Sequence, residues 1–243
     1  MTRLDALLVA RGLARSRAQA AALIRAGKVR VPGVSRPKPA TTVAPDIALD
    51  ADSDPWVSRA AHKLLGALTD LEITIPDRVL DAGSSTGGFT QVALAHGAQH
   101  VYAVDVGTDQ LAASLRTDPR VTVHERTNLR DLSLAHVDHA PVDLVVADVS
   151  FISLTLLFEP LFSVLREDGQ ALLLVKPQFE VGRERLGKGG VVRDPVVRAQ
   201  ACADVEAAAA AHGWQVYGTA DSRLPGPAGN VEHFLLLGSP HLC

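Results

Sequence analysis

The chain has 243 residues, of which 47% are hydrophobic and 21% are charged, as in an ordinary soluble globular protein. No segment approaches the ~18 to 20 apolar residues of a membrane span, and the first residues lack an uninterrupted apolar signal segment, so we expect a cytoplasmic protein. Cys202 and Cys243 match no metal-binding or redox spacing, so no metal site is predicted.

The net charge of -3 conceals an uneven distribution along the chain. Residues 1–50 contain nine basic and three acidic residues, a net charge of +6. Because the whole chain has 24 basic and 27 acidic residues, residues 51–243 have 15 and 24, a net charge of -9. A basic segment on an acidic body indicates a polyanion-binding module, although a solvated basic surface without a partner has the same charge.

The first 50 residues are predicted to form two helices followed by two strands. The first helix ends at Gly12, and the second is capped by Ser16 and ends at Gly27. The stretch KVRVPG alternates as a strand does, and a second short strand is expected near Ile47. The apolar residues at helical spacing are Leu4, Leu7 and Leu8 in the first helix, and Ala20, Leu23 and Ile24 in the second.

This order of residues resembles the S4 RNA-binding domain. The start RLD, then GLA-x-SR, A-x-x-LI-x-x-G-x-V and a late KP occur in sequence over about the first 50 residues. The resemblance implies that the partner is a structured RNA. Arg15, Arg17 and Arg25 lie on one side of the second helix, where guanidinium groups can contact phosphates. The candidate RNA-binding residues are Arg3, Arg11, Arg15, Arg17, Arg25, Lys28 and Lys38.

Residues 51–58, ADSDPWVS, are predicted to be a linker, with Trp56 as an anchor. Beyond them, apolar strands alternate with helices, which predicts an α/β domain with a doubly wound parallel sheet. The segment SRLPGPAGN joins the last two strands without a helix, so we expect these two strands to pair antiparallel. The predicted strands are 78–82, 100–105, 120–124, 142–148, 170–176, 214–220 and 232–238, and the clearest helices are 88–97, 153–166 and 195–212.

A glycine-rich loop interrupts the stretch VLDAGSSTGGFTQVAL, residues 79–94, between a strand and a helix. Its G-x-x-x-G-G spacing fits neither the dinucleotide fingerprint nor the Gly-Lys-Ser/Thr of a phosphate-binding loop. An acid at the strand end, followed by small residues, suits an adenosyl group that carries a cation. The predicted cofactor-binding residues in this loop are Asp81, Gly83, Ser84, Ser85, Thr86, Gly87, Gly88 and Phe89.

Further polar residues end or follow the next strands, at the edge where ligands bind in such sheets. A carboxylate at the end of the second strand usually binds a ribose diol, because it accepts both hydroxyl protons. Any one of these residues alone is more simply a helix cap or a solvated loop residue, but their number at one edge favours a site. They are Asp105 at the second strand, Asn128 and Asp131 after the third, Asp148 at the fourth and Lys176 at the fifth. The apolar Val106, next to Asp105, is a further predicted cofactor contact.

The glycine-rich loop, DVG from residue 105 and DVSFIS from residue 148 resemble the class I S-adenosylmethionine-dependent methyltransferases. SRAAHKL around residue 63, KPQFE from residue 176 and GNVEH around residue 232, with the S4-like head, resemble the TlyA (hemolysin A) family of ribosomal RNA 2′-O-methyltransferases, which are related to FtsJ in their catalytic domain. This resemblance covers essentially the whole chain. It implies a Rossmann-like fold, S-adenosyl-L-methionine as cofactor, and methylation of cytidine ribose in ribosomal RNA.

The resemblance also implies domain limits and site residues. Residues 1–50 correspond to the S4-like domain, 51–58 to the linker and 59–243 to the methyltransferase domain. Asn128 stands where many methyltransferases have an acid for the adenine amino group, and its amide oxygen can accept the same bond. Asp148 is expected to contact the cofactor as well as the substrate. The catalytic tetrad of the family maps onto Lys63, Asp148, Lys176 and Glu232.

The chemistry of 2′-O-methylation is consistent with such a tetrad. A ribose hydroxyl is a poor nucleophile, so it must be aligned with the methyl group and helped to lose its proton. A lysine accepts a proton only in its neutral form, which burial favours and neighbouring carboxylates disfavour. The sequence therefore supports positioning by the network more firmly than a neutral Lys176 as general base. Taken alone, Lys63 fits an exposed helix lysine and Glu232 a charge at a strand edge.

Two other functions compete with this interpretation. A ribosome-binding assembly factor with a catalytically silent cofactor fold would have the same residues. A membrane-lysing protein, as the older family name suggests, needs a strongly amphipathic basic segment. The alanine-rich helix 199–211 instead contains Asp204 and Glu206 and has no basic residue after Arg198, which disfavours lysis. We therefore expect ribosomal RNA or ribosomal subunits as partners, no membrane, and infer no obligate protein partner.

Overall fold

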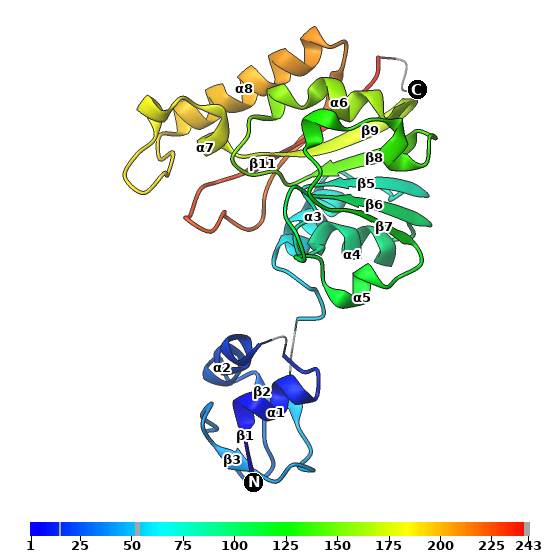
Figure 1. The fold of residues 1–243 in the computed structure, drawn as a ribbon. Helices are drawn as coiled ribbons and strands as arrows, with labels where there is room; N and C mark the ends of the chain where they lie inside the picture. Colours follow the sequence, from blue (N-terminus) through cyan, green and yellow to red (C-terminus); the bar gives the residue numbers. More distant parts are fainter. Residues whose placement is uncertain (15, 52–53, 241–243) are drawn as a thin grey trace. The chain divides into compact units, whose positions relative to one another are not determined.

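The computed structural model describes residues 1–14, 16–51 and 54–240. The chain divides into two compact units, Met1–Pro55 and Trp56–Cys243 (Figure 1). Each unit has hydrophobic clusters of its own. Arg15, one of the predicted RNA contacts, lies outside the described residues.

The first unit contains the two predicted helices, α1 (Leu4–Ala10) and α2 (Arg17–Arg25). The side chain of Ser16 caps α2 by accepting a hydrogen bond from the backbone N–H of Gln19, 3.2 Å away, as expected for a serine at this position. Leu4, Leu8 and Ala20 are fully buried between the helices. The unit therefore closes around the apolar residues that the helical spacing picks out.

The strands of this unit differ from the prediction. β1 (Thr2–Arg3) pairs with β3 (Thr42–Val43), and β2 (Val29–Arg30) pairs with β4 (Asp50–Ala51), all antiparallel. The strand expected near Ile47 is wrong, because Ile47 lies in the turn between β3 and β4. Its carbonyl instead accepts a hydrogen bond from the guanidinium of Arg11, at 2.5 Å. Strands of two residues are too short to show an alternating pattern in the sequence.

The second unit is built on a seven-stranded sheet with the order β10-β11-β9-β8-β5-β6-β7. The five strands from β9 to β7 are parallel, β11 is antiparallel to β9, and β10 is antiparallel to β11. The predicted strand set and the antiparallel pairing of the last two strands are thus confirmed. The strands are β5 (Arg78–Ala82), β6 (His100–Val104), β7 (Val121–His124), β8 (Val142–Ala147), β9 (Leu165–Val175), β10 (Gln215–Asp221) and β11 (His233–Gly238).

Helices cover both faces of this sheet (Figure 1). Along each strand, successive side chains point to opposite faces, so Val79 packs on the face with α3 and α4, and Leu80 on the face with α6 and α8. The helices are α3 (Ala60–Asp70), α4 (Gly88–Ala95), α5 (Ala113–Arg116), α6 (Phe158–Ser163), α7 (Pro177–Glu180) and α8 (Pro195–Ala211).

One predicted helix, 153–166, is wrong as a continuous element. The segment forms a short 3-10 turn at Leu154–Leu156, then α6, and β9 already begins at Leu165. The pairing of Leu165 with Val142 of β8 draws these residues into the sheet. Such a strand-to-strand pairing is not visible in the local apolar spacing of the sequence.

Candidate active site

The loop that joins β5 to α4 begins and ends at glycines in the left-handed backbone region. Gly83 has a φ of 84° and Gly87 a φ of 92°, a conformation that glycine adopts without steric cost. A Cβ atom at Gly83 would lie 3.1 Å from the carbonyl oxygen of Asp148, which directly follows the neighbouring strand β8, and one at Gly88 would collide with the Ser58 hydroxyl. The glycines therefore let this loop lie against two neighbouring segments.

Asp81, at the end of β5, is a buried carboxyl group below this loop, with only 1% of its surface exposed. Its Oδ2 accepts a hydrogen bond of 2.6 Å from the Thr90 hydroxyl on α4. Its Oδ1 is buried and has no hydrogen-bond partner among the described residues. Burial raises the pKa of Asp81 to about 7, the Thr90 hydroxyl opposes this shift, and Asp148 and Asp105 add to it. A bound cation beside this group would favour its ionised form.

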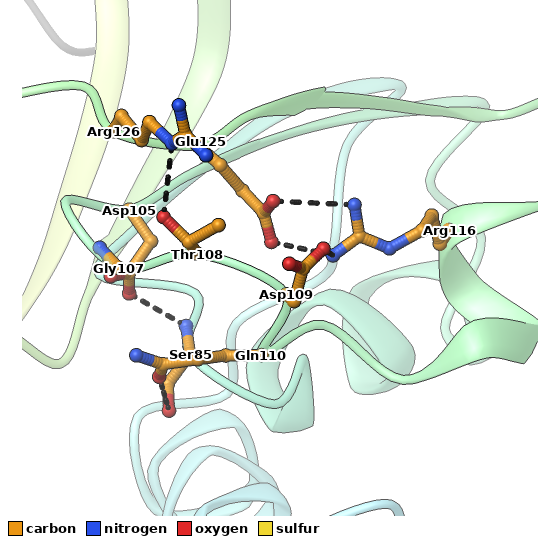
Figure 2. Close-up of polar contacts among 9 residues, drawn as sticks. All are labelled: Ser85, Asp105, Gly107, Thr108, Asp109, Gln110, Arg116, Glu125 and Arg126. Atoms are coloured by element: carbon orange, nitrogen blue, oxygen red, sulfur yellow. Dashed lines mark hydrogen bonds and ion pairs between the residues drawn. The ribbon is translucent and has the colours of Figure 1, made fainter.

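Asp105, which follows β6, organises the next loop (Figure 2). Its carboxylate accepts hydrogen bonds from the backbone N–H of Ser85, at 2.8 Å, and from that of Gly107, at 2.6 Å. Each carboxylate oxygen can accept further bonds, because an ionised carboxylate has about four acceptor sites. The acid thus links the loops after β5 and β6 and still has acceptor capacity for a diol.

Side-chain contacts of Arg116 and Arg126 hold the loop 106–111 in place (Figure 2). The Arg126 Nε donates to the Thr108 hydroxyl at 3.2 Å. Arg116 lies 4.0 Å from the Asp109 carboxylate and forms an ion pair of 2.5 Å with Glu125. The neighbouring Val106 is 74% exposed. An apolar side chain at this position offers a surface for a flat ring.

Two adjoining cavities lie at the carboxyl ends of the parallel strands. The first, of about 450 Å³, is lined by Asp105, Val106 and Asn128 among others. The second is lined by Lys63, Asp81 and Lys176 among others. The residues common to both linings are Gly83, Ser85, Asp148 and Ser150. An elongated ligand can therefore extend from the Asp105 side to the two lysines.

The four predicted catalytic residues are brought together by four different elements. Lys63 lies on α3, Asp148 follows β8, Lys176 follows β9 and Glu232 precedes β11. Lys63 Nζ is 2.6 Å from Glu232 Oε2 and 3.8 Å from Asp148 Oδ2, and Lys176 Nζ is 2.6 Å from Asp148 Oδ1. The charges therefore alternate, positive and negative, along a connected row.

The row is almost sealed from solvent. Lys63 is 4% exposed, Lys176 7% and Glu232 1%, so Lys63 is not the exposed helix lysine that its sequence alone allows. Pro177 is the first residue of α7, and its ring ends the strand directly after Lys176. Buried charges are stabilised only when they are paired, and each of these four has an opposite charge beside it.

Two residues of the site were not predicted from the sequence. The Ser150 hydroxyl accepts a hydrogen bond of 2.8 Å from Lys176 Nζ. Phe151 is 91% exposed, adopts a φ of 65° and lies with its ring centre 5.2 Å from that of Phe179. A left-handed backbone at a bulky residue is unusual and is found most often at functional sites. The only sequence feature that could have indicated these two residues is the stretch DVSF directly after β8.

The remaining predicted cofactor contacts lie partly in the two cavities and partly in the core beneath the loop. Asn128 lines the first cavity, and its Oδ1 already accepts a bond of 3.1 Å from the Arg130 backbone N–H. Thr86 lines the second cavity. Ser84 is buried, and the ring of Phe89, 2% exposed, stacks 6.2 Å from that of Phe234 in the core. Phe89 thus supports the loop from beneath.

In the first unit, the predicted RNA contacts fall into two groups. Arg3 and Arg17 form ion pairs of 2.8 and 3.1 Å with the buried Asp5, whose pKa is lowered chiefly by the hydrogen bonds from Arg3. Arg11 donates to two backbone carbonyls. These arginines therefore also hold the unit together. The other described members of this set, Arg25, Lys28 and Lys38, are exposed.

The fold and the two adjoining cavities define a methyltransferase of the FtsJ-like class with an S4 domain. The FtsJ-like methyltransferase family matches residues 56–239, and the S4 domain matches residues 2–46. Enzymes of this class use S-adenosyl-L-methionine as methyl donor. The Asp81 oxygen without a partner among the described residues suits the cation of this cofactor, and the Asp105 carboxylate suits its ribose. The close-packed glycines let the cofactor lie against the protein backbone.

Comparison with individual proteins identifies the family within this class. The chain is 54% identical to the 16S/23S rRNA (cytidine-2′-O)-methyltransferase TlyA of Mycobacterium tuberculosis over 97% of this chain and 89% of that protein. It is 40% identical to the 23S rRNA (cytidine-2′-O)-methyltransferase TlyA of Campylobacter jejuni, covering 77% and 73%. A solved structure described as a hemolysin from Streptococcus thermophilus is 37% identical, with a TM-score of 0.77 and coverage of 99% and 89%. The chain belongs to the TlyA family.

Proposed function

We propose that this protein methylates the 2′-hydroxyl of cytidine in ribosomal RNA, with S-adenosyl-L-methionine as donor. The observation that carries the proposal is the row of Lys63, Asp148, Lys176 and Glu232. Lys63, Asp148 and Lys176 of this row line a cavity that shares part of its lining with a second, adenosine-sized cavity. The two relatives named above act on cytidine of 16S and 23S RNA, and of 23S RNA. Both names support the proposed substrate.

The cofactor supplies an electrophilic methyl group on a sulfonium, and the chain supplies the alignment of the acceptor. A ribose hydroxyl beside Lys176 Nζ meets a group that is fixed by Asp148 and the Ser150 hydroxyl and therefore cannot rotate away. The methyl group bonds to the ribose oxygen, its bond to sulfur breaks, and the hydroxyl proton leaves to a basic group of the row. Positioning of this kind contributes a large part of the rate in such reactions.

Phe151 supports the choice of RNA as the acceptor. Its exposed ring lies at the rim of the first cavity, one residue from Ser150 and next to the ring of Phe179. Unpaired RNA bases stack on aromatic side chains when proteins read single-stranded loops. We assign the ring to the target base, which would bring the attached ribose toward Lys176.

The first unit is the proposed RNA anchor, with Arg25, Lys28 and Lys38 as its exposed contacts. Residues 1–50 are basic, with a net charge of +6, whereas residues 51–243 have a net charge of -9. Phosphate binding by this unit explains how an acidic catalytic unit holds a polyanion.

The test uses ribosomal RNA and separated subunits from a strain that lacks the modification. They are incubated with the protein and labelled cofactor, and ribose methylation is mapped by nucleotide. We expect a new 2′-O-methylcytidine. A protein that binds the cofactor and the RNA but adds no methyl group would instead be an assembly factor with a silent cofactor fold. Comparison of 16S and 23S RNA determines whether one or both subunits are modified.

A membrane-lysing function has less support. Among the described residues, no helix is both long enough and apolar enough to cross a membrane. The long helix α8 contains Asp204 and Glu206 and has no basic residue after Arg198. It also packs against the sheet through Ala201, Val205 and Ala209, which are buried. A helix whose apolar side is already used in the core has no free face for a lipid surface.

A further inference from the structure

The segment 182–193, GRERLGKGGVVR, is a basic glycine-rich loop between α7 and α8, here called the basic loop. Its Arg185, Lys188 and Arg193 are exposed. The basic loop and the loop that precedes β11 extend from the same end of the sheet (Figure 1). Neither the S4 match nor the four-residue row accounts for these cations.

The three cations are unpaired within the part of the chain that the structure describes. No hydrogen bond or ion pair involves the side chains of Arg185, Lys188 or Arg193 in residues 1–14, 16–51 and 54–240. Two other exposed arginines of the same unit, Arg120 and Arg166, do have partners. Arg120 is paired with Asp118 at 2.8 Å, and Arg166 with Asp143 at 2.9 Å.

Asn230 ties the far end of the basic loop to the active site. This side chain is 2% exposed; its Oδ1 accepts from the Val192 backbone N–H at 2.9 Å, and its Nδ2 donates to the Gly190 carbonyl at 3.1 Å. Asn230 stands two positions before Glu232 in the chain. The far end of the basic loop, at Gly190 and Val192, is therefore held beside the segment that leads to Glu232.

The near end of the basic loop is anchored in the same region. It follows α7, which starts directly after Lys176. The Glu180 carboxylate at the end of α7 accepts hydrogen bonds from the Ser153 hydroxyl, at 2.5 Å, and from the Leu154 backbone N–H, at 3.0 Å. Ser153 lies in the segment that carries Ser150 and Phe151. Both ends of the basic loop are thus bound to segments that form the site.

We propose that the basic loop binds backbone phosphates of the RNA strand on either side of the target ribose. The proposal rests on the proposed function, because a ribose held at Lys176 places its own phosphates within the surroundings of that site. Guanidinium and ammonium groups suit phosphate, and phosphate contacts fix the register of a nucleic acid. Gly189 and Gly190 have φ values of 79° and 73°, and a Cβ at either would meet nothing within 4 Å, so the space beside these two residues is open.

The test compares two variants that lose the same amount of charge. Arg185→Gln/Lys188→Gln removes two cations from the basic loop. Arg120→Gln/Arg166→Gln removes two at the opposite ends of strands, since Arg120 immediately precedes β7 and Arg166 is near the start of β9. The probe is unmodified ribosomal RNA, and its affinity is measured without cofactor at several salt concentrations. Methylation rates and cofactor affinity are measured separately.

We expect the basic-loop variant to bind RNA about tenfold more weakly, with a salt slope smaller by roughly 1.4 to 1.8, as for two lost phosphate contacts. Its cofactor affinity and its rate at saturating RNA should stay near those of the wild type. Equal RNA binding and salt slopes in both variants would overturn the proposal. A variant that binds free RNA normally but fails only on assembled subunits would overturn it too, and would assign the basic loop to a ribosomal protein.

Failure of the proposed function and failure of the basic-loop proposal give different results. If the wild-type protein bound RNA but transferred no methyl group, the proposed reaction would fail while the salt dependence still tested the basic loop. If methylation occurred and the basic-loop variant kept the wild-type slope, only the phosphate contact would fail.

Discussion

The ammonium nitrogen of Lys63 lies 2.6 Å from Oε2 of Glu232, although 169 positions separate the two residues in the chain. Lys63 comes from α3 on one face of the sheet, and Glu232 precedes β11. Both are buried, so neither charge is stabilised by solvent. Removal of one partner leaves a buried unpaired charge, which links catalysis in this site to its stability.

The first prediction concerns Lys176. Lys176→Ala should lower the single-turnover rate of RNA methylation by ~10² to 10⁴, because a positioned acid–base group acts mainly in the transition state. Affinities for cofactor and RNA should change little. Lys63→Ala and Glu232→Ala should behave similarly. A substitution of Asp148 should also lower the affinity for the cofactor.

A double variant Lys63→Ala/Lys176→Ala should be much less than multiplicatively slower than the single variants, since the residues act as one unit. Circular dichroism and thermal unfolding separate lost chemistry from lost structure. Turnover close to that of the wild type in Lys176→Ala would contradict the assigned row and leave the base unassigned.

Gly226 provides the second prediction, because it lies against the Glu232 carboxylate. A Cβ at Gly226 would lie 2.5 Å from Glu232 Oε1. Gly226→Ala should therefore displace Glu232 from Lys63 and slow methylation at least ~10-fold, while cofactor affinity is kept. Ala228→Ser, on an exposed residue of the same loop, is the matched control. Equal methylation rates for both variants would show that the contact between Gly226 and Glu232 does not affect catalysis.

Third, Asp105→Ala should weaken S-adenosylmethionine binding strongly. The variant loses a charged acceptor worth about 1.5 to 3 kcal/mol per hydrogen bond, and it also releases the N–H groups of Ser85 and Gly107. Asp105→Asn keeps one acceptor oxygen and should bind with intermediate affinity. Titration calorimetry measures all three proteins, and unchanged affinity in Asp105→Ala would reject this residue as the ribose ligand.

The fourth prediction is a pH dependence from Asp81, whose pKa is raised to about 7 by burial. The cofactor's sulfonium favours the ionised carboxyl, so binding below pH 7 must release a proton. Cofactor affinity should rise with pH up to about 7 and then level off. In the free protein the sign is opposite: the contribution of Asp81 to stability is present below its usual pKa and is lost as pH rises through about 7.

Asp81→Asn tests both effects, because an amide does not titrate in this range. Its cofactor affinity and its free energy of unfolding should vary less between pH 5 and 8 than those of the wild type. Calorimetry in buffers of different ionisation enthalpy counts the released protons. Proton release that persists in Asp81→Asn would assign the effect to another group.

The fifth prediction concerns the separate units. A protein that begins at Trp56 should fold and bind cofactor, because the two units have separate hydrophobic clusters. It should methylate RNA poorly and bind RNA more weakly, with the largest difference at low salt. RNA binding equal to that of the whole chain would show that residues 1–55 are not the anchor.

Removal of residues 1–58 should be more harmful to the fold than removal of residues 1–55. Trp56 packs against the core of the second unit, and the Val57 backbone N–H donates to the Gln91 side chain at 2.7 Å. Thermal unfolding of the two shortened proteins tests this difference. Equal unfolding temperatures would mean that these contacts contribute little to stability.

Much of the fold was determined by local sequence. The apolar runs specify the seven strands of the second unit, because buried parallel strands read as near-continuous Val, Leu and Ile. Ser16 and Gly27 mark the limits of α2, since capping and left-handed termination depend on single residues. The resemblance to the TlyA family pointed to the four residues of the row.

Features that depend on contacts between distant segments were decided only by the tertiary structure, because the spacing of residues along the chain carries no information about them. The two-residue strands of the first unit and the start of β9 at Leu165 depend on pairing with distant segments. So does the burial of Lys63, which a helix pattern alone leaves undetermined. Ser150 at Lys176, Gly226 at Glu232 and Asn230 at the basic loop are contacts between segments, and through-space contacts of this kind leave no periodic signal in a sequence.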